Sequence, residues 1–136
     1  MKFIIIFLLM CFTLKANSLI DQRQNSMNEI KELLQSSGAY IKGQKIDPTM
    51  AALYERISII MLEFPTLFSA ESLKSPSKAN KNIIEEKPIF TKLAEDTSML
   101  AAKARIAVMN HDMAMLLDSH HKLLNQCQTC HSRYRE

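Results

Sequence analysis

The sequence contains few of the residues that form tight turns. Its 136 residues include two glycines, four prolines and no tryptophan. A β-sandwich needs turns at short intervals, and these turns depend on glycine and proline. Alanine, leucine, lysine, glutamate and methionine are frequent instead, and all of them favour helices. With 47% hydrophobic residues available for a core, the composition predicts a single all-α domain.

The N-terminal segment predicts export from the cytoplasm. Lys2 supplies a positive start, and residues 3–14 form an apolar run broken only by Thr13. Small residues at Ala16 and Ser18 suit a cleavage site, so residues 1–18 are expected to be a signal peptide and residues 19–136 the mature domain. The run is short for a spanning helix, which needs about 20 apolar residues, so a retained membrane anchor is the less favoured alternative. The expected location is the periplasm.

Removing this segment leaves a chain with no strong excess of either charge. Lys2 and Lys15 leave with it, so 15 of the 17 basic residues remain beside all 14 acidic residues, a net charge of +1. This balance gives no basic footprint for nucleic acid. Cys11 leaves as well, and the mature chain then has two cysteines, Cys127 and Cys130.

Apolar residues at helical spacing predict four helices. The first covers about residues 19–37, with Gly38 expected to end it, and the second runs from Asp47-Pro48 to Pro65. The third begins near Pro88, and the fourth extends from Met113 almost to the C-terminus. Residues 66–86 are expected to be mainly a long surface connection. Four amphipathic helices with these links predict an antiparallel four-helix bundle.

The segment "CQTCH", residues 127–131, carries the clearest chemistry in the chain. Residues at i and i+3 of a helix share one face, so Cys127 and Cys130 could each bond to a vinyl group of one haem. His131 follows directly and could bind the iron. The motif therefore predicts one covalently attached haem c, with His131 as an iron ligand.

Two other chemistries fit the motif less well. A zinc site needs four ligands, and the chain offers no second pair at similar spacing. A thiol oxidoreductase usually places the cysteine pair at a helix N-terminus, where the helix dipole lowers the thiol pKa, whereas this pair is expected near a C-terminal end. A Cys127–Cys130 disulfide in a haem-free periplasmic interaction protein stays open as an alternative.

The sequence resembles the cytochrome c′ family, the class II c-type cytochromes, over nearly all of the mature chain. In that family the C-terminal haem motif is followed by a tyrosine and a basic residue, as Tyr134 and Arg135 follow it in "CQTCHSRYR". The segments "EFPTLF" and "NIIEEKPIF" resemble the parts of the family that follow the second helix and begin the third. The chain departs from the family at Ile84, where the family often has tryptophan.

The resemblance also assigns roles in the first helix. The family carries an arginine there and, four residues later, the side chain that faces the open side of the iron; "RQNSM" places Arg23 and Met27 at these positions. Arg23 shares one helical face with Ile20, Met27 and Ile30, and a charge on this apolar stripe needs a partner or access to solvent. A haem propionate is therefore one expected partner of Arg23, and a surface position at the edge of the stripe is the other interpretation.

Met27 divides the expected functions. The resemblance implies that members with methionine at this position have six-coordinate, low-spin iron and carry electrons, whereas members with an apolar residue there bind nitric oxide or carbon monoxide at five-coordinate iron. We expect Met27 and His131 to be the axial ligands of a non-enzymatic single-electron carrier that meets periplasmic or membrane redox partners. In the alternative, Met27 is core filler and the protein binds gas. A homodimer is compatible with the resemblance.

The other methionines of the mature chain are expected in the core, where an unbranched thioether fills gaps. They are Met50, Met61, Met99, Met109, Met113 and Met115.

Overall fold

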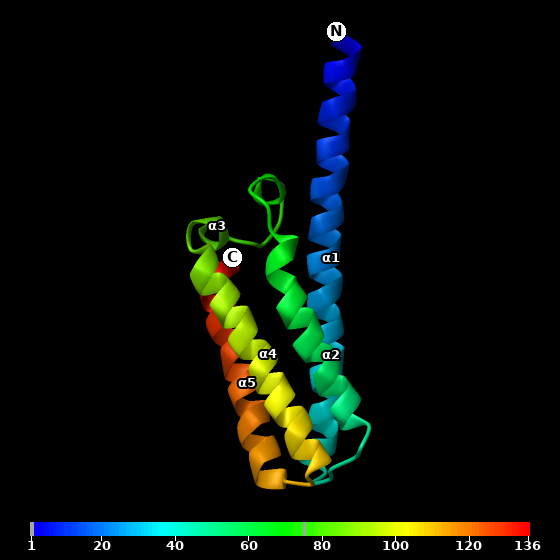
Figure 1. Ribbon diagram of the computed structural model, residues 1–136, viewed down its shortest axis with the longest axis vertical. Coiled ribbons are helices and arrows are strands. Elements are labelled where there is room, and N and C mark those ends of the chain that lie inside the picture. Colours follow the sequence, from blue (N-terminus) through cyan, green and yellow to red (C-terminus); the bar gives the residue numbers. More distant parts are fainter. Residues whose placement is uncertain (1, 75) are drawn as a thin grey trace.

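The computed structural model describes residues 2–74 and 76–136, with side chains from Ser18 onward. Four long helices run alternately up and down: α1 (Lys2–Lys42), α2 (Met50–Glu63), α4 (Lys87–Met109) and α5 (Met113–Tyr134). Figure 1 shows these helices side by side, with the C-terminus beside the short helix α3 (Asn82–Glu85). The predicted antiparallel four-helix bundle is therefore confirmed.

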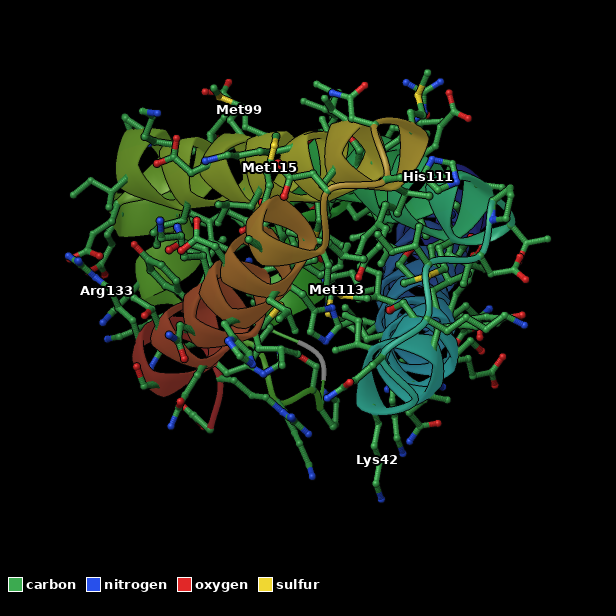
Figure 2. The ribbon with its side chains drawn as sticks, turned by 90° about the horizontal axis from the view of Figure 1, so that it is seen from below. Lys42, Met99, His111, Met113, Met115 and Arg133 are labelled. Carbon is green, nitrogen blue, oxygen red and sulfur yellow. The ribbon has the colours of Figure 1, made fainter. Side chains whose placement is uncertain are left out.

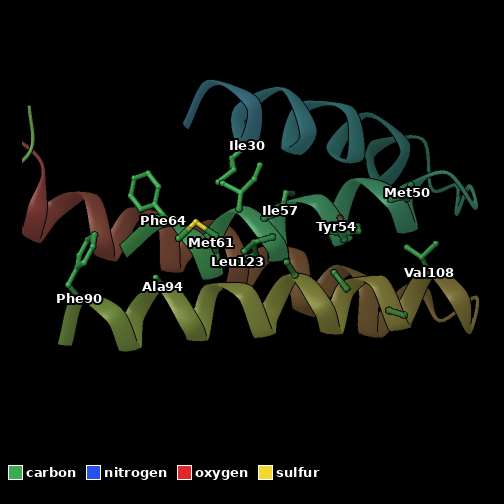
Figure 3. Packing of buried hydrophobic residues seen from close by; sticks show 14 of the residues in the cluster. Ile30, Met50, Tyr54, Ile57, Met61, Phe64, Phe90, Ala94, Val108 and Leu123 are labelled. Carbon is green, nitrogen blue, oxygen red and sulfur yellow. The ribbon is translucent and has the colours of Figure 1, made fainter. Parts of the chain in front are cut away.

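The core forms where α2, α4 and α5 meet. Backbone contact is closest between α2 and α4 and between α4 and α5, whereas α1 packs on α2 and on the segment that follows it. Tyr54, Ile57 and Leu123 are fully buried in this core, and Figure 3 shows Ile30 of α1 reaching toward it from the other side. Alanines on the inner face of α4 let the helices approach closely; the fully buried ones are Ala101, Ala104 and Ala107.

The first two helices differ from their predicted boundaries. Gly38 lies inside α1, which ends at Lys42 because Tyr40 and Ile41 still pack against the core. A helical glycine costs only about 1 kcal/mol, which this packing offsets. Helix α2 begins at Met50, two residues later than predicted, because the Asp47 carboxylate accepts hydrogen bonds from the Thr49 backbone and hydroxyl at 2.9 and 2.6 Å.

The connection between α2 and α4 is more ordered than a surface loop. It contains two 3-10 helices, η1 (Phe64–Leu67) and η2 (Glu71–Leu73), followed by α3. Phe68, Ser72 and Ile83 are buried, so the prediction of a mainly exposed segment is wrong for these positions. The Phe64 and Phe68 rings of this segment pack edge to face with each other, and Phe68 packs in the same way on Phe90 of α4.

The second pair of helices follows the predicted boundaries. Helix α4 begins one residue before Pro88, whose fixed φ and missing N–H suit a first turn. Helix α5 begins at Met113, where the Asp112 carboxylate accepts a hydrogen bond from the Met115 N–H at 2.9 Å. These boundaries depend on local residues, which is why the sequence predicted them.

The methionines divide between core and surface. Met50 and Met61 are buried, and Met113 and Met115 are half-buried against the core. Met99 and Met109 are 68% and 57% exposed, so the prediction that they belong to the core is wrong. Both stand on the outer face of α4, where Met99 is visible in Figure 2, while the buried alanines occupy the inner face.

The predicted signal peptide lies almost wholly in residues 1–17, whose side chains are outside the described part, so it stays a prediction. Among the helices that the structure describes, none is long and apolar enough to cross a membrane.

Candidate cofactor site

The two C-terminal cysteines lie near the end of α5, as the motif predicted. Both are half-buried, and neither is joined in a disulfide. Burial raises the pKa of the Cys127 thiol, and burial together with Cys127 raises the pKa of Cys130 to about 11. A thiol oxidoreductase needs the opposite shift, because its thiolate is the nucleophile. The raised pKa values therefore argue against thiols that exchange disulfides.

His131 follows the cysteines on the exposed end of the helix. Partial burial and the nearby Arg135 guanidinium lower the pKa of His131, so the neutral imidazole predominates at neutral pH. The neutral ring is the form that binds iron. Two half-buried thiols at i and i+3 with an imidazole directly after them match the donor set that a covalent haem requires. Cys127, Cys130 and His131 therefore fit the cofactor.

Helix α1 holds the two remaining predicted site residues. Met27 is half-buried and packs against the same hydrophobic core as Cys130. Arg23, one turn earlier, is only 5% exposed, so the interpretation of a surface arginine is wrong. Its guanidinium donates to the Ser72 hydroxyl at 2.8 Å and to the Leu67 carbonyl at 3.1 Å. Pairing with a haem propionate stays a prediction beside these contacts.

The other histidines lie away from this donor set. His120 is buried between α5 and α2, and its Nδ1 lies 2.9 Å from the Tyr54 hydroxyl, within hydrogen-bond distance. Burial, with a smaller effect of His121, lowers the pKa of His120. His111 and His121 are exposed. We assign His120 to the internal structure of the bundle.

The sequence did not reveal the residues that hold the end of α5. Glu86, just before α4, accepts hydrogen bonds from Arg133 Nε at 2.8 Å and from the Tyr134 hydroxyl at 2.9 Å. The Tyr134 ring packs edge-on against Phe90. Helical spacing places Tyr134 on the same face as the buried Leu116 and Leu123, but nothing near Glu86 in the sequence indicated a partner 47 residues away.

A helical bundle whose last helix ends in this thiol–thiol–imidazole set defines a c-type haem protein. The family model described as cytochrome C′ matches residues 18–135. The chain therefore belongs to the cytochrome c′ family, and it binds one covalently attached c-type haem.

Solved structures of this family share the fold. Cytochrome c′ from Thermochromatium tepidum superposes with a TM-score of 0.80 at 17% identity, over 88% of this chain and 95% of that one. A ferrous variant from Alcaligenes xylosoxidans gives 0.80 at 17% identity, over 89% and 96%. A variant from Rhodopseudomonas palustris gives 0.75 at 25% identity, over 86% and 96%. No curated protein sequence matches the chain.

Proposed function

We propose that the protein carries single electrons, with a haem bonded to Cys127 and Cys130 and with His131 and Met27 as its two axial ligands. The haem supplies the one-electron chemistry when bound. Cys127 and Cys130, both half-buried, would hold that group, and His131 and Met27 would present one nitrogen and one sulfur donor. We expect no catalysed reaction on a substrate.

The position of Met27 carries this proposal. Met27 packs against the core from α1, whereas Met113 and Met115, also half-buried against the core, lie at the start of α5, the helix that carries His131, and Met99 and Met109 point to solvent. Sulfur from a methionine raises the reduction potential of a haem that a histidine also binds. With both axial positions filled by protein side chains, small ligands have no open position to occupy.

The proposed setting is the periplasm, reached through cleavage after Ser18, with a retained N-terminal anchor as the alternative. The partners would be periplasmic or membrane redox proteins. A homodimer is also compatible with the family: one solved cytochrome c′ is described by its ligand-controlled dimer dissociation.

A second candidate function is gas binding at five-coordinate iron, with Met27 acting only as core filler. It is favoured by one observation on a relative: a variant of the Alcaligenes xylosoxidans protein was solved as a nitric oxide complex. The half-buried state of Met27 is compatible with this function too, because methionine packs well in irregular gaps.

Electron paramagnetic resonance of the oxidised holoprotein tests the proposal. We expect a low-spin signal in the wild type and a high-spin signal in Met27→Leu, because the substitution removes the sulfur donor and keeps an apolar side chain. Met50→Leu is the matched control, since Met50 is fully buried in α2; it should remain low-spin. A high-spin wild type would remove Met27 from the iron and make gas binding the better function.

A further inference from the structure

A continuous row of buried contacts joins α1 to α5 at the end of the bundle that carries the cofactor site. The Arg23 guanidinium carbon lies 4.7 Å from the ring centroid of Phe68. The rings of Phe68 and Phe90 are 4.9 Å apart, and those of Phe90 and Tyr134 are 5.1 Å apart; both pairs meet edge to face. Arg23, Phe68, Phe90 and Tyr134 are all buried. This row, called the Arg23–Tyr134 row below, links two helices that otherwise pack mainly on other elements.

Each end of the row is anchored by hydrogen bonds. At the α1 end, Arg23 donates to the Ser72 hydroxyl and the Leu67 carbonyl. At the α5 end, the Tyr134 hydroxyl donates to Glu86, which also accepts a bond from Arg133. Figure 2 shows Arg133 at the outer edge of the molecule.

The backbone fixes the α5 end a second time. The Asn80 N–H donates to the Tyr134 carbonyl at 2.9 Å, and the Glu136 N–H donates to the Lys78 carbonyl at 2.8 Å. An exposed ion pair such as Glu86–Arg133 contributes little by itself. Here the same carboxylate oxygen also holds the buried tyrosine, so Glu86 ties the last turn of α5 to the beginning of α4.

The ends of the row lie close to the proposed iron ligands along the chain. Arg23 precedes Met27 by four residues, a rise of about 6 Å along a helix, and Tyr134 follows His131 by three residues, a rise of about 4.5 Å. The position of the exposed His131 therefore depends on the backbone of the turn that Tyr134 anchors. A displacement at either end would change the spacing between the two helices that present the ligands.

We propose that the Arg23–Tyr134 row sets the spacing between α1 and α5 at the haem, and that Glu86 is a positioning residue for the iron ligands. The part that concerns the ligands rests on the proposed function, in which Met27 and His131 both bind iron. Loss of Glu86 frees Tyr134 and Arg133 and loosens the end of α5, so that His131 and Met27 would no longer be held at the spacing that lets both bind the iron.

Carbon monoxide binding to the reduced holoprotein tests this role. We compare the wild type with Glu86→Ala, Glu86→Gln and the control Glu85→Ala, whose exposed side chain forms no hydrogen bond or ion pair within the described residues. We expect the wild type and Glu85→Ala to be nearly inert and Glu86→Ala to bind at least about tenfold faster, because the open form becomes more populated. Glu86→Gln keeps an acceptor oxygen and should lie between them. Equal rates in Glu86→Ala and the wild type would overturn the positioning role.

Hydrogen exchange separates a failure of this inference from a failure of the proposed function. If the wild type itself binds carbon monoxide rapidly, Met27 is not a ligand, and the row is then judged by exchange alone. We expect Glu86→Ala to raise exchange in residues 20–30 of α1 as well as in residues 127–136. Phe68→Leu, inside the row beside Arg23, should raise exchange in the same two segments, as should Tyr134→Phe to a smaller extent. Increases confined to the neighbourhood of each substitution would show that the row does not couple the helices.

Discussion

Replacing Tyr54 with phenylalanine removes one hydroxyl from the interior of the bundle and keeps the ring. Tyr54 is fully buried and His120 is 6% exposed, so the hydroxyl and Nδ1, 2.9 Å apart, have little access to water. A buried polar group left without its partner costs about 1–3 kcal/mol. For a domain of this size each kcal/mol lowers the melting temperature by about 4 °C. The expected loss for Tyr54→Phe is therefore about 4–12 °C.

Thermal unfolding followed by far-ultraviolet circular dichroism measures this change in the holoprotein. Tyr40→Phe is the matched control, because Tyr40 is half-buried and its hydroxyl forms no hydrogen bond among the described residues; it should change the melting temperature by less than about 2 °C. Neither Tyr54 nor Tyr40 belongs to the cofactor site, so the haem spectrum should stay the same in both variants. An unchanged melting temperature in Tyr54→Phe would show that His120 does not depend on this contact.

Three further results follow from the same contacts. Burial lowers the pKa of His120 below its ordinary 6.5, so the unfolded chain binds the proton more readily than the folded chain. The free energy of unfolding should therefore decrease as the pH falls from 6.5 through the folded pKa. Urea unfolding at about pH 7.5 and about pH 5.5 measures this decrease, which should be smaller in His120→Gln. Asp112→Ala should cost about 1 kcal/mol in the same urea assay, because the Met115 N–H loses its cap, and no change would argue against that cap. Cys130→Ser should leave one thioether bond, so denaturation in acidified organic solvent should retain the haem on the chain in the intact-mass spectrum, and its release would contradict attachment through Cys127.

Local patterns were sufficient to predict the second half of the bundle. Pro88 and Asp112 act on the turns beside them, so the starts of α4 and α5 could be predicted from neighbouring residues. The end of α1 could not, because Gly38 gives a stop pattern that packing of Tyr40 and Ile41 overrides. Propensity is a weak guide wherever tertiary contacts decide.

In the cofactor site, too, neighbouring residues could be interpreted from the sequence, whereas contacts between distant residues could not. The residues of "CQTCH" are consecutive, so their chemistry is visible in the sequence. Arg23 was recognised as a charge on an apolar stripe, but its partner Ser72 lies 49 residues away and in a segment that lacks periodicity. Glu86 and Tyr134 are 48 residues apart and meet only because α4 and α5 are antiparallel. Pairings of this kind depend on the fold and cannot be deduced from spacing alone.

The visible absorption spectrum of the matured protein, oxidised and reduced, before and after carbon monoxide, tests the central claim most directly. With Met27 and His131 both bound to iron, both oxidation states should give low-spin spectra, and the reduced spectrum should not respond to the gas. A high-spin spectrum that shifts with carbon monoxide would contradict axial ligation by Met27 and assign the protein to gas binding.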